Sequence, residues 1–334
     1  MEFSVLEWVV YLIVIFLGII FFSIITFLYN EFRYNLFHKI HLYTMKIPPP
    51  RSRVLIFVPH PDDEVAVCGG FIARAVKNGC KVKVVLITNG DGLGLVDRLN
   101  FLGRKPSAEY FEKTAVIRQN ETRTALSMLG VPEKDIIFFG FPDRCLLHLW
   151  GNHWDVDKPF TSIYTGRNCA FYPTSYTQDL GYTGSNMVHN LEKIIKQFAP
   201  THIIYPHFYD CHVDHFSANN FIKYTLAKLD LHVVEYTYLV HRGNWPVPPG
   251  EFPSLYLTPP KALADCGIRW YSLNLSPAEI ALKAKCLRVF KTQLKNLLMK
   301  TYLLSFLRRN ELFAEYPDIQ ARLNKKTKIN IINP

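Results

Sequence analysis

The most pronounced feature of the hydropathy pattern is the run 8–29, which carries no charge and is dense in Val, Ile, Leu and Phe. As a helix it measures roughly 33 Å, and a bilayer core is ~30 Å thick. A cleaved signal peptide and a buried core helix are the alternatives. The signal peptide fits less well, because Glu2 and Glu7 stand where basic residues are expected and no Ala-x-Ala site follows. The pattern favours a transmembrane helix.

Charges on either side of this run predict its orientation. No Lys or Arg precedes it, whereas basic residues follow it closely, namely Arg33, Lys39, Lys46, Arg51 and Arg53. The positive-inside rule then places the rest of the chain in the cytoplasm. The seven cysteines are scattered without a CxxC pair, which is typical of a reducing compartment. We therefore expect a single-pass membrane protein whose main domain faces the cytoplasm.

Beyond the tripeptide 48–50, which is all proline, apolar runs alternate with helical patterns. Continuous β-branched and aromatic runs predict buried parallel strands, and segments with helical periodicity, one of which ends at Gly130, predict helices. The expected strands are 54–58, 81–88, 135–139, 202–205 and 231–240, and the expected helices are 69–78, 112–129, 188–198 and 217–229. This alternation predicts an α/β fold, with a mostly parallel, Rossmann-like sheet and helices on both faces.

The chain is expected to have four parts. They are a transmembrane anchor (1–30), a basic juxtamembrane linker (31–52), a globular domain (53–316) and a C-terminal tail (317–334). Two long segments without a regular pattern, about 91–110 and about 144–186, interrupt the domain. Such segments are either lids and binding loops or surface excursions that pack on their own aromatic side chains.

Residues suited to chemistry gather directly after two predicted strands. The segment 59–64 (PHPDDE) follows the strand 54–58, and the segment 210–215 (DCHVDH) follows the strand 202–205. Ligands bind beyond the carboxyl ends of strands in doubly wound sheets, so both segments are expected at one edge. Their histidines and carboxylates suit a catalytic zinc, which takes three protein ligands and leaves a position for water. Such a metal acidifies water and polarises a carbonyl, as amide hydrolysis requires.

Each segment alone also has an ordinary structural interpretation. His-Pro-Asp is a frequent turn, and His212 and His215 are equally explained as capping or core residues before a helix that begins near Ser217. The occurrence of both segments, each at the end of a predicted strand, favours the functional interpretation.

The stretch VLIFVPHPDDEVAVCGGFIA resembles the opening of the LmbE-like (PIG-L) deacetylase family, whose hallmark is a His-Pro-Asp-Asp-Glu loop. DCHVDH resembles its second hallmark, and RQNETRTALSMLG resembles its Arg-x-x-Glu helix. With RNCAFYPTSYT and RNELFAE, the resemblance covers roughly residues 53–316. It implies removal of the acetyl group from an N-acetylglucosamine-type amino sugar, and the anchor would suit a lipid- or polysaccharide-linked one. It also implies one Zn²⁺, or another divalent metal, per chain.

The resemblance implies a role for each matching residue of the two hallmark segments. The metal ligands would be His60, Asp63 and His215. Asp62 would be the general base that acts on water. His212 would stabilise the oxyanion or protonate the amine, with Asp214 holding its ring nitrogen and raising its basicity.

Four further positions are expected around the substrate or the metal. Arg118 would contact substrate, and Asp143 stands where the family often has a sugar-binding carboxylate. Some members have a tyrosine where this chain has Asp210, so help from a tyrosine is in doubt. Glu64 is expected to be a supporting residue rather than a ligand.

The turn 88–92 (TNGDG) follows the strand 81–88 and should face the same site. A phosphate-binding loop is the rival interpretation, but no GxGxxG or Walker pattern is present. We interpret it as a tight turn that brings Asn89 and Asp91 to the substrate pocket.

The formal charge of +10 is concentrated in part over residues 278–309, which have the periodicity of one long amphipathic helix. Its basic residues are Lys283, Lys285, Arg288, Lys291, Lys295, Lys300, Arg308 and Arg309. They form either a solvated face over an ordinary core or a face that meets anionic lipid headgroups. Nucleic acid is not an expected partner, since no recognition motif accompanies the charge.

Two other functions use the same residues. A metal-dependent phosphoester hydrolase should have two metals and more bridging carboxylates. A non-catalytic, membrane-anchored glycan-binding module should lack some of the reactive residues, whereas Asp62, His212 and all three expected ligands are present. The deacetylase is therefore the leading hypothesis.

Overall fold

The computed structural model describes residues 5–37, 41–92, 106–264 and 266–315. The strands are β1 (Tyr43–Thr44), β2 (Arg53–Val58), β3 (Lys81–Thr88), β4 (Ile136–Phe141), β5 (His202–Pro206), β6 (Val234–Tyr238), β7 (Arg269–Asn274) and β8 (Asn310–Glu315). The α-helices are α1 (Val5–Phe37), α2 (Asp63–Lys77), α4 (Ala108–Met128), α5 (Leu146–Trp150), α6 (Gly184–Phe198), α7 (Val213–Lys228), α8 (Lys261–Ala264), α9 (Pro277–Leu287), α10 (Lys291–Leu294) and α11 (Leu297–Leu304). The expected tail 317–334 and most of the expected loop 91–110 lie outside the described residues.

The eight strands form one sheet in the order β1-β7-β8-β6-β5-β2-β3-β4. Strand β8 runs antiparallel to its neighbours β6 and β7, and the other pairs are parallel. From β2 the chain proceeds outward through β3 and β4, whereas β5 and β6 lie on the other side of β2. The loops after β2 and β5 therefore leave the same edge as neighbours, at the point where the strand order reverses.

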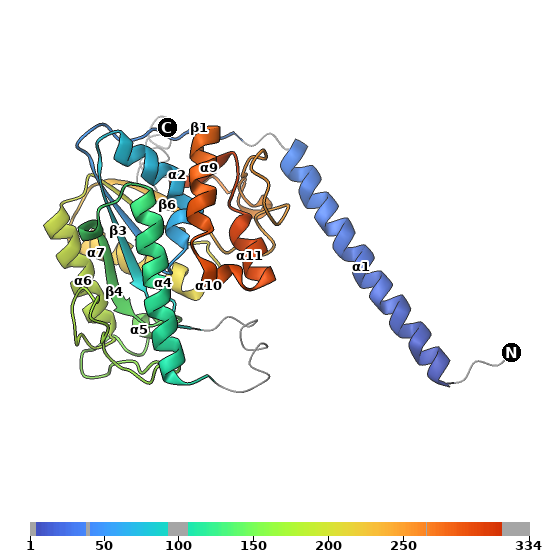
Figure 1. Ribbon diagram of the computed structural model, residues 1–334, viewed down its shortest axis with the longest axis horizontal. Helices are drawn as coiled ribbons and strands as arrows, with labels where there is room; N and C mark the ends of the chain where they lie inside the picture. The colour runs from blue at the N-terminus through green and yellow to red at the C-terminus, as the bar shows by residue number, and fades with distance from the viewer. Residues whose placement is uncertain (1–4, 38–40, 93–105, 265, 316–334) are drawn as a thin grey trace, which may run out of the picture.

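Helices cover both faces of the sheet, and β2 shows why. Val54, Ile56 and Val58 belong to one core cluster, together with residues of α2, α9 and α11. Leu55 and Phe57 belong to the other, together with residues of α5, α6 and α7. Side chains of a strand alternate between faces, so a strand that is apolar throughout needs cover on both sides. Figure 1 shows this body, with α1 projecting away from it.

Helix α1 contains one stretch, Trp8–Phe27, that is long and apolar enough to cross a bilayer, and none of it is buried against the rest of the protein. The helix continues to Phe37, and Tyr43 and Thr44 pair with β7 in the sheet. Residues 31–52, which we expected to form a linker, thus contain both the end of α1 and the first strand.

The C-terminal part of the chain differs most from expectation. The predicted single helix over 278–309 is wrong, because the structure divides it into α9, α10 and α11. The Asn296 side chain accepts hydrogen bonds from the amides of Leu298 and Met299, which begins a new helix. Strands β1, β7 and β8 were also not predicted from the sequence. Helical periodicity predicted the burial of Leu287 and Phe290, but not the breaks between the helices or the exposure of Leu297 and Leu298.

The segment 144–186 is packed rather than open. Trp150 and Trp154 lie against Phe221 of α7, with ring centroids 4.8 and 6.0 Å from it. Tyr172 and Tyr182 are buried. Of the two interpretations, the structure supports a surface excursion that packs on aromatic side chains.

A buried ion pair joins α2 to the C-terminal elements. Glu311 of β8 accepts hydrogen bonds from the ammonium of Lys283 at 2.8 Å and from the amides of Gly70 and Phe71 at 2.7 and 2.8 Å. A Cβ on Gly70 would lie 2.4 Å from a methyl carbon of Leu275, so a larger residue there would displace the Leu275 side chain. The contact holds the helix that begins with Asp63.

Candidate metal centre and active site

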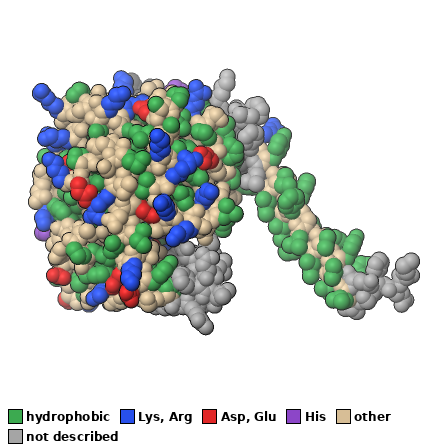
Figure 2. Space-filling view, in the orientation of Figure 1, with side chains coloured by type: hydrophobic (Ala, Val, Ile, Leu, Met, Phe, Trp, Pro, Cys, Tyr) green, Lys and Arg blue, Asp and Glu red, His purple; other side chains and the backbone are tan. Residues whose placement is uncertain are grey.

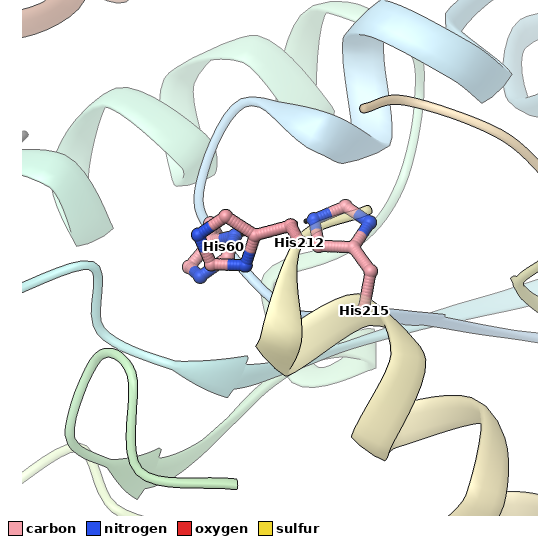
Figure 3. Close-up of side chains that lie close together, drawn as sticks. All are labelled: His60, His212 and His215. Atoms are coloured by element: carbon pink, nitrogen blue, oxygen red, sulfur yellow. Dashed lines mark hydrogen bonds between the residues drawn. The ribbon is translucent and has the colours of Figure 1, made fainter. Parts of the chain in front are cut away.

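Three side chains from the two hallmark loops converge on one point. His60 Nδ1 lies 3.5 Å from Asp63 Oδ2, His215 Nε2 lies 3.1 Å from the same oxygen, and the two nitrogens are 3.3 Å apart. Ligand bonds of ~2.0–2.1 Å in a tetrahedral zinc site place ligand atoms ~3.3 Å apart. The three atoms thus have the spacing of one face of a zinc tetrahedron, so the residues fit this metal. Figure 3 shows His60 meeting His212 and His215, which come from the start of α7.

Carboxylates stand behind His60 and orient its ring. Its Nε2 lies 3.0 Å from Asp143 Oδ1 and 3.1 Å from Asp214 Oδ2. Burial opposes the charged imidazolium, but these contacts and Asp63 outweigh it and hold the pKa of His60 well above its ordinary value. A proton on Nε2 leaves the lone pair of Nδ1 facing the centre, which is the tautomer a metal requires.

Asp210 has the corresponding place behind His215. Its Oδ2 lies 3.3 Å from His215 Nδ1 and accepts hydrogen bonds from the amides of Val240 and His241 at 2.9 and 3.0 Å. Its Oδ1 accepts a hydrogen bond from the amide of His212 at 2.9 Å. Burial raises the pKa of Asp210, but His215 and His241 lower it by more. The pKa therefore lies below its ordinary value and the carboxylate stays ionised. Asp210, which stands where some family members have a tyrosine, therefore supports the candidate ligand His215.

His241 was not found from the sequence. It follows β6 at the same edge of the sheet, and its Nδ1 lies 3.4 Å from Asp210 Oδ1. Its ring centroid lies 4.6 Å from that of His215, and the two histidines and Asp210 offer atoms within 4.8 Å of one another. A lone histidine after a strand carries no distinctive pattern. The one available signal was that His241 follows a strand in the parallel part of the sheet.

Asp62 is held in a strained conformation. Its φ of 108° lies in the left-handed region, which costs an aspartate roughly 1–3 kcal/mol. Its amide donates to Glu64 Oε2 at 2.9 Å, and its carboxylate accepts from Arg118 at 3.1 Å. Burial raises the pKa of Asp62 to about 7, with Arg118 acting against the rise and Asp63 adding to it. A carboxylate of this pKa is suited to proton transfer near neutral pH.

His212 is the N-cap of α7, and its Nδ1 accepts the amide hydrogen of Asp214 at 3.2 Å. The neutral ring therefore carries its hydrogen on Nε2 and can donate it to an oxygen. Burial and the neighbouring histidines lower the pKa of His212 to about 2. The expectation that Asp214 holds His212 and raises its basicity is wrong, because the Asp214 carboxylate lies against His60 instead.

Arg118 and the turn after β3 surround Asp62 and Asp143. Arg118 donates to the carbonyls of Pro61 and Gly90 at 2.7 and 2.8 Å. A Cβ on Gly90, whose φ is +60°, would lie 2.2 Å from the Arg118 guanidinium, so a glycine is needed there. The guanidinium is thus committed largely to the loop that carries Asp62.

Asn89 and Asp91 are almost completely buried, at 0% and 1% exposure. Asn89 accepts a hydrogen bond from Gln119 at 2.8 Å, and Asp91 accepts one from the Asp143 amide at 2.7 Å. These contacts differ from the expected direct contact with substrate. They place both residues as supports of the loops around the site.

The sequence model of the PIG-L family, described as GlcNAc-PI de-N-acetylase, matches residues 55–225. This is just over half of the chain, and the chain belongs to this family of deacetylases. A stretch of 96 residues is 36% identical to the 1D-myo-inositol 2-acetamido-2-deoxy-alpha-D-glucopyranoside deacetylase of Geodermatophilus obscurus. That match covers 28% of this chain and 31% of the relative.

Two solved structures have a similar fold. The A40926 pseudoaglycone deacetylase is 17% identical, with 79% of this chain and 96% of that one covered at a TM-score of 0.50. A deacetylase of the teicoplanin biosynthesis pathway is 16% identical, with 80% and 99% covered at a TM-score of 0.50. At this level of identity the likeness concerns the fold.

Proposed function

We propose that the protein is a zinc-dependent N-deacetylase, anchored in a membrane by α1, that hydrolyses the acetamide of an N-acetylglucosamine-type sugar. One observation carries this proposal: His60 Nδ1, Asp63 Oδ2 and His215 Nε2 lie 3.1–3.5 Å from one another. Membership of a deacetylase family supports the reaction class, and the named relatives support an amino-sugar substrate.

The roles of the residues follow from their contacts. His60, Asp63 and His215 hold the metal, which when bound acidifies water and polarises the amide carbonyl. Asp62 takes a proton from the attacking water, and its raised pKa lets it return that proton to the nitrogen of the departing amine. His212 donates its Nε2 hydrogen to the carbonyl oxygen as negative charge develops there.

Arg118 and Glu64 keep Asp62 in place through its carboxylate and its amide. Asp214 and Asp143 orient His60, and Asp210 orients His215. This assignment alters the sequence-based one: Asp214 and Asp143 act on a metal ligand, and Arg118 acts on the base. Asn89 and Asp91 support the surrounding loops.

The anchor and its orientation are part of the proposal. Residues 1–30 hold the chain in the bilayer, and the basic residues after the span place the deacetylase domain, 53–316, in the cytoplasm. A membrane-bound enzyme meets lipid-linked sugars directly, so we expect the substrate to be a lipid-linked amino sugar. Sealed, inside-out vesicles test the orientation: protease added outside should digest the domain, and survival of the domain would contradict the proposal.

Acetate release by the full chain in detergent, from free and lipid-linked N-acetylated sugars, tests the reaction. A chelator should abolish release and zinc should restore it. Asp62→Asn should lower kcat by about 10²–10⁴-fold. Asp157→Asn, an exposed aspartate in the excursion, is the control and should leave kcat unchanged. Full release by the chelated protein or by Asp62→Asn would overturn the mechanism.

A further inference from the structure

The first turn of α11 presents a pair of leucines to solvent. Leu297 and Leu298 are 74% and 65% exposed, which is high for large apolar side chains outside α1. Lys291, Lys295 and Lys300, the nearest basic residues along the chain, are also exposed. We call these five residues the α11 corner. Figure 2 shows basic side chains among apolar ones on the face that carries α9 and α10.

The charges of the α11 corner differ from those of Lys283, Arg288 and Arg308 in the same basic region. Lys283 is buried against Glu311, Arg308 is fully buried, and Arg288 pairs with Glu251 at 2.7 Å. Among the ion pairs of the described residues, none involves a lysine of the α11 corner. Exposed leucines with uncommitted lysines close by in the sequence match the interfacial region of an anionic bilayer, where apolar side chains enter and ammonium groups meet headgroups.

The C-terminal end of α11 packs on a segment that also meets the end of the candidate span. Phe27, the last residue of that span, lines a pocket of about 550 Å³ together with Arg242, Trp245 and Lys261. The segment 245–250 contacts Ser305 and Phe306, which directly follow α11. The Trp245 ring lies 5.6 Å from that of Phe306, and the amide of Gly250 donates to Ser305 at 2.6 Å.

The C-terminal half of α11 also contacts a residue beside the metal centre. Tyr302, one turn after Leu298, stacks on His241 with ring centroids 5.6 Å apart and an interplanar angle of 23°. Its hydroxyl donates to the carbonyl of Val240 at 2.9 Å.

We propose that the α11 corner docks on the surface of the bilayer that holds α1. Leu297 and Leu298 enter the interface, the three lysines contact anionic headgroups, and the side of the site formed by His241 is held at the membrane surface. The inference rests on the anchoring contained in the proposed function and is independent of the reaction.

Photo-crosslinking of the full chain in liposomes of phosphatidylcholine and phosphatidylserine tests this docking. Benzoylphenylalanine is placed at Leu298, at Val156 or at Ile15, and lipid adducts are measured by mass spectrometry. Val156 is the matched control, because it is 66% exposed against 65% for Leu298. Ile15 lies in α1 and reports anchoring. We expect adducts at Leu298 and Ile15 and few at Val156.

Each other outcome is decisive. Adducts at Ile15 but none at Leu298, or equal yields at Leu298 and Val156, would overturn the docking and leave the anchor intact. No adduct at Ile15 would overturn the anchor and the docking together, while acetate release would still report on the enzyme.

The charges are tested in the same liposomes. Lys295→Gln and Lys300→Gln should each lower the Leu298 adduct yield by up to about fivefold. Lys158→Gln, an exposed lysine in the excursion, should not change it. Equal yields in neutral and anionic liposomes would overturn the role of the lysines.

Discussion

Helix α2 has a buried ionic cluster at its start and another at its middle, and the two are built differently. At the start, Asp62 and Asp63 meet histidines and Arg118, and Asp62 is held at a φ of 108°. At the middle, Glu311 receives one ammonium and two backbone amides, and both it and Lys283 are only 1% exposed.

The cluster at the middle of α2 is complete, since one carboxylate meets one cation and two amides. The cluster at the start gathers several largely buried carboxylates around histidines that share one open point. Its members are Asp62, Asp63, Asp143, Asp210 and Asp214. Backbone strain and closely spaced like charges are typical of ligand-binding sites. Here a divalent cation would balance the negative charges. The cluster at the start of α2 is suited to binding a cation, and the cluster at its middle is suited to stabilising the fold.

The largest expected effect concerns the metal. Asp63→Asn should remove the metal from the purified protein, as measured by mass spectrometry of bound zinc, because it deletes a charged ligand. Asp62→Asn should retain the metal and lose acetate release. If Asp63→Asn bound zinc as tightly as the unaltered protein, the assignment of this ligand would be refuted.

The next effect concerns stability. Lys283→Met should lower the free energy of unfolding by about 3–5 kcal/mol, since it leaves the Glu311 carboxylate buried without its cation. Lys285→Met, at an exposed position two residues along α9, should change it little. Denaturant titration in detergent measures both. Equal stabilities would contradict the structural role of the pair.

A smaller effect is expected behind His215. Asp210→Asn should weaken zinc affinity by about 10–100-fold, because it removes the charge that orients His215 Nδ1. Asp230→Asn, whose side chain is 96% exposed, is the control. Competition with a chelator gives both affinities, and no difference between them would show that Asp210 does not support the ligand.

The smallest effect is a change of pH dependence. Burial raises the pKa of Asp91 to about 7, so between pH ~4 and ~7 the folded state keeps a proton that the unfolded state has lost. Stability from this group is thus present at low pH and declines as pH rises through that window. Asp91→Asn should remove a decline of up to about 1.4 kcal/mol per pH unit. Urea titrations at pH 5.5 and 6.5 measure it. The same change in the free energy of unfolding between the two pH values for both proteins would contradict it.

Much of the parallel sheet could be predicted because its signals are local. The run 81–88 was predicted as a strand and is β3, and both hallmark loops follow strands as expected. The predicted mostly parallel order holds for every pair except those of β8. The contacts of Asp214 and Asp210 were not predictable, since each depends on which loops meet at the sheet edge.

By itself, the sequence determined the apolar strands, the long uncharged helix and the residue types available for a metal, because periodicity and composition act over a few neighbours. Only the tertiary structure decided which carboxylate stands behind which histidine, that His241 joins the site, and that Lys283 is buried while Lys295 is exposed. Those outcomes depend on distances between residues far apart in the chain, and packing against the sheet determines them.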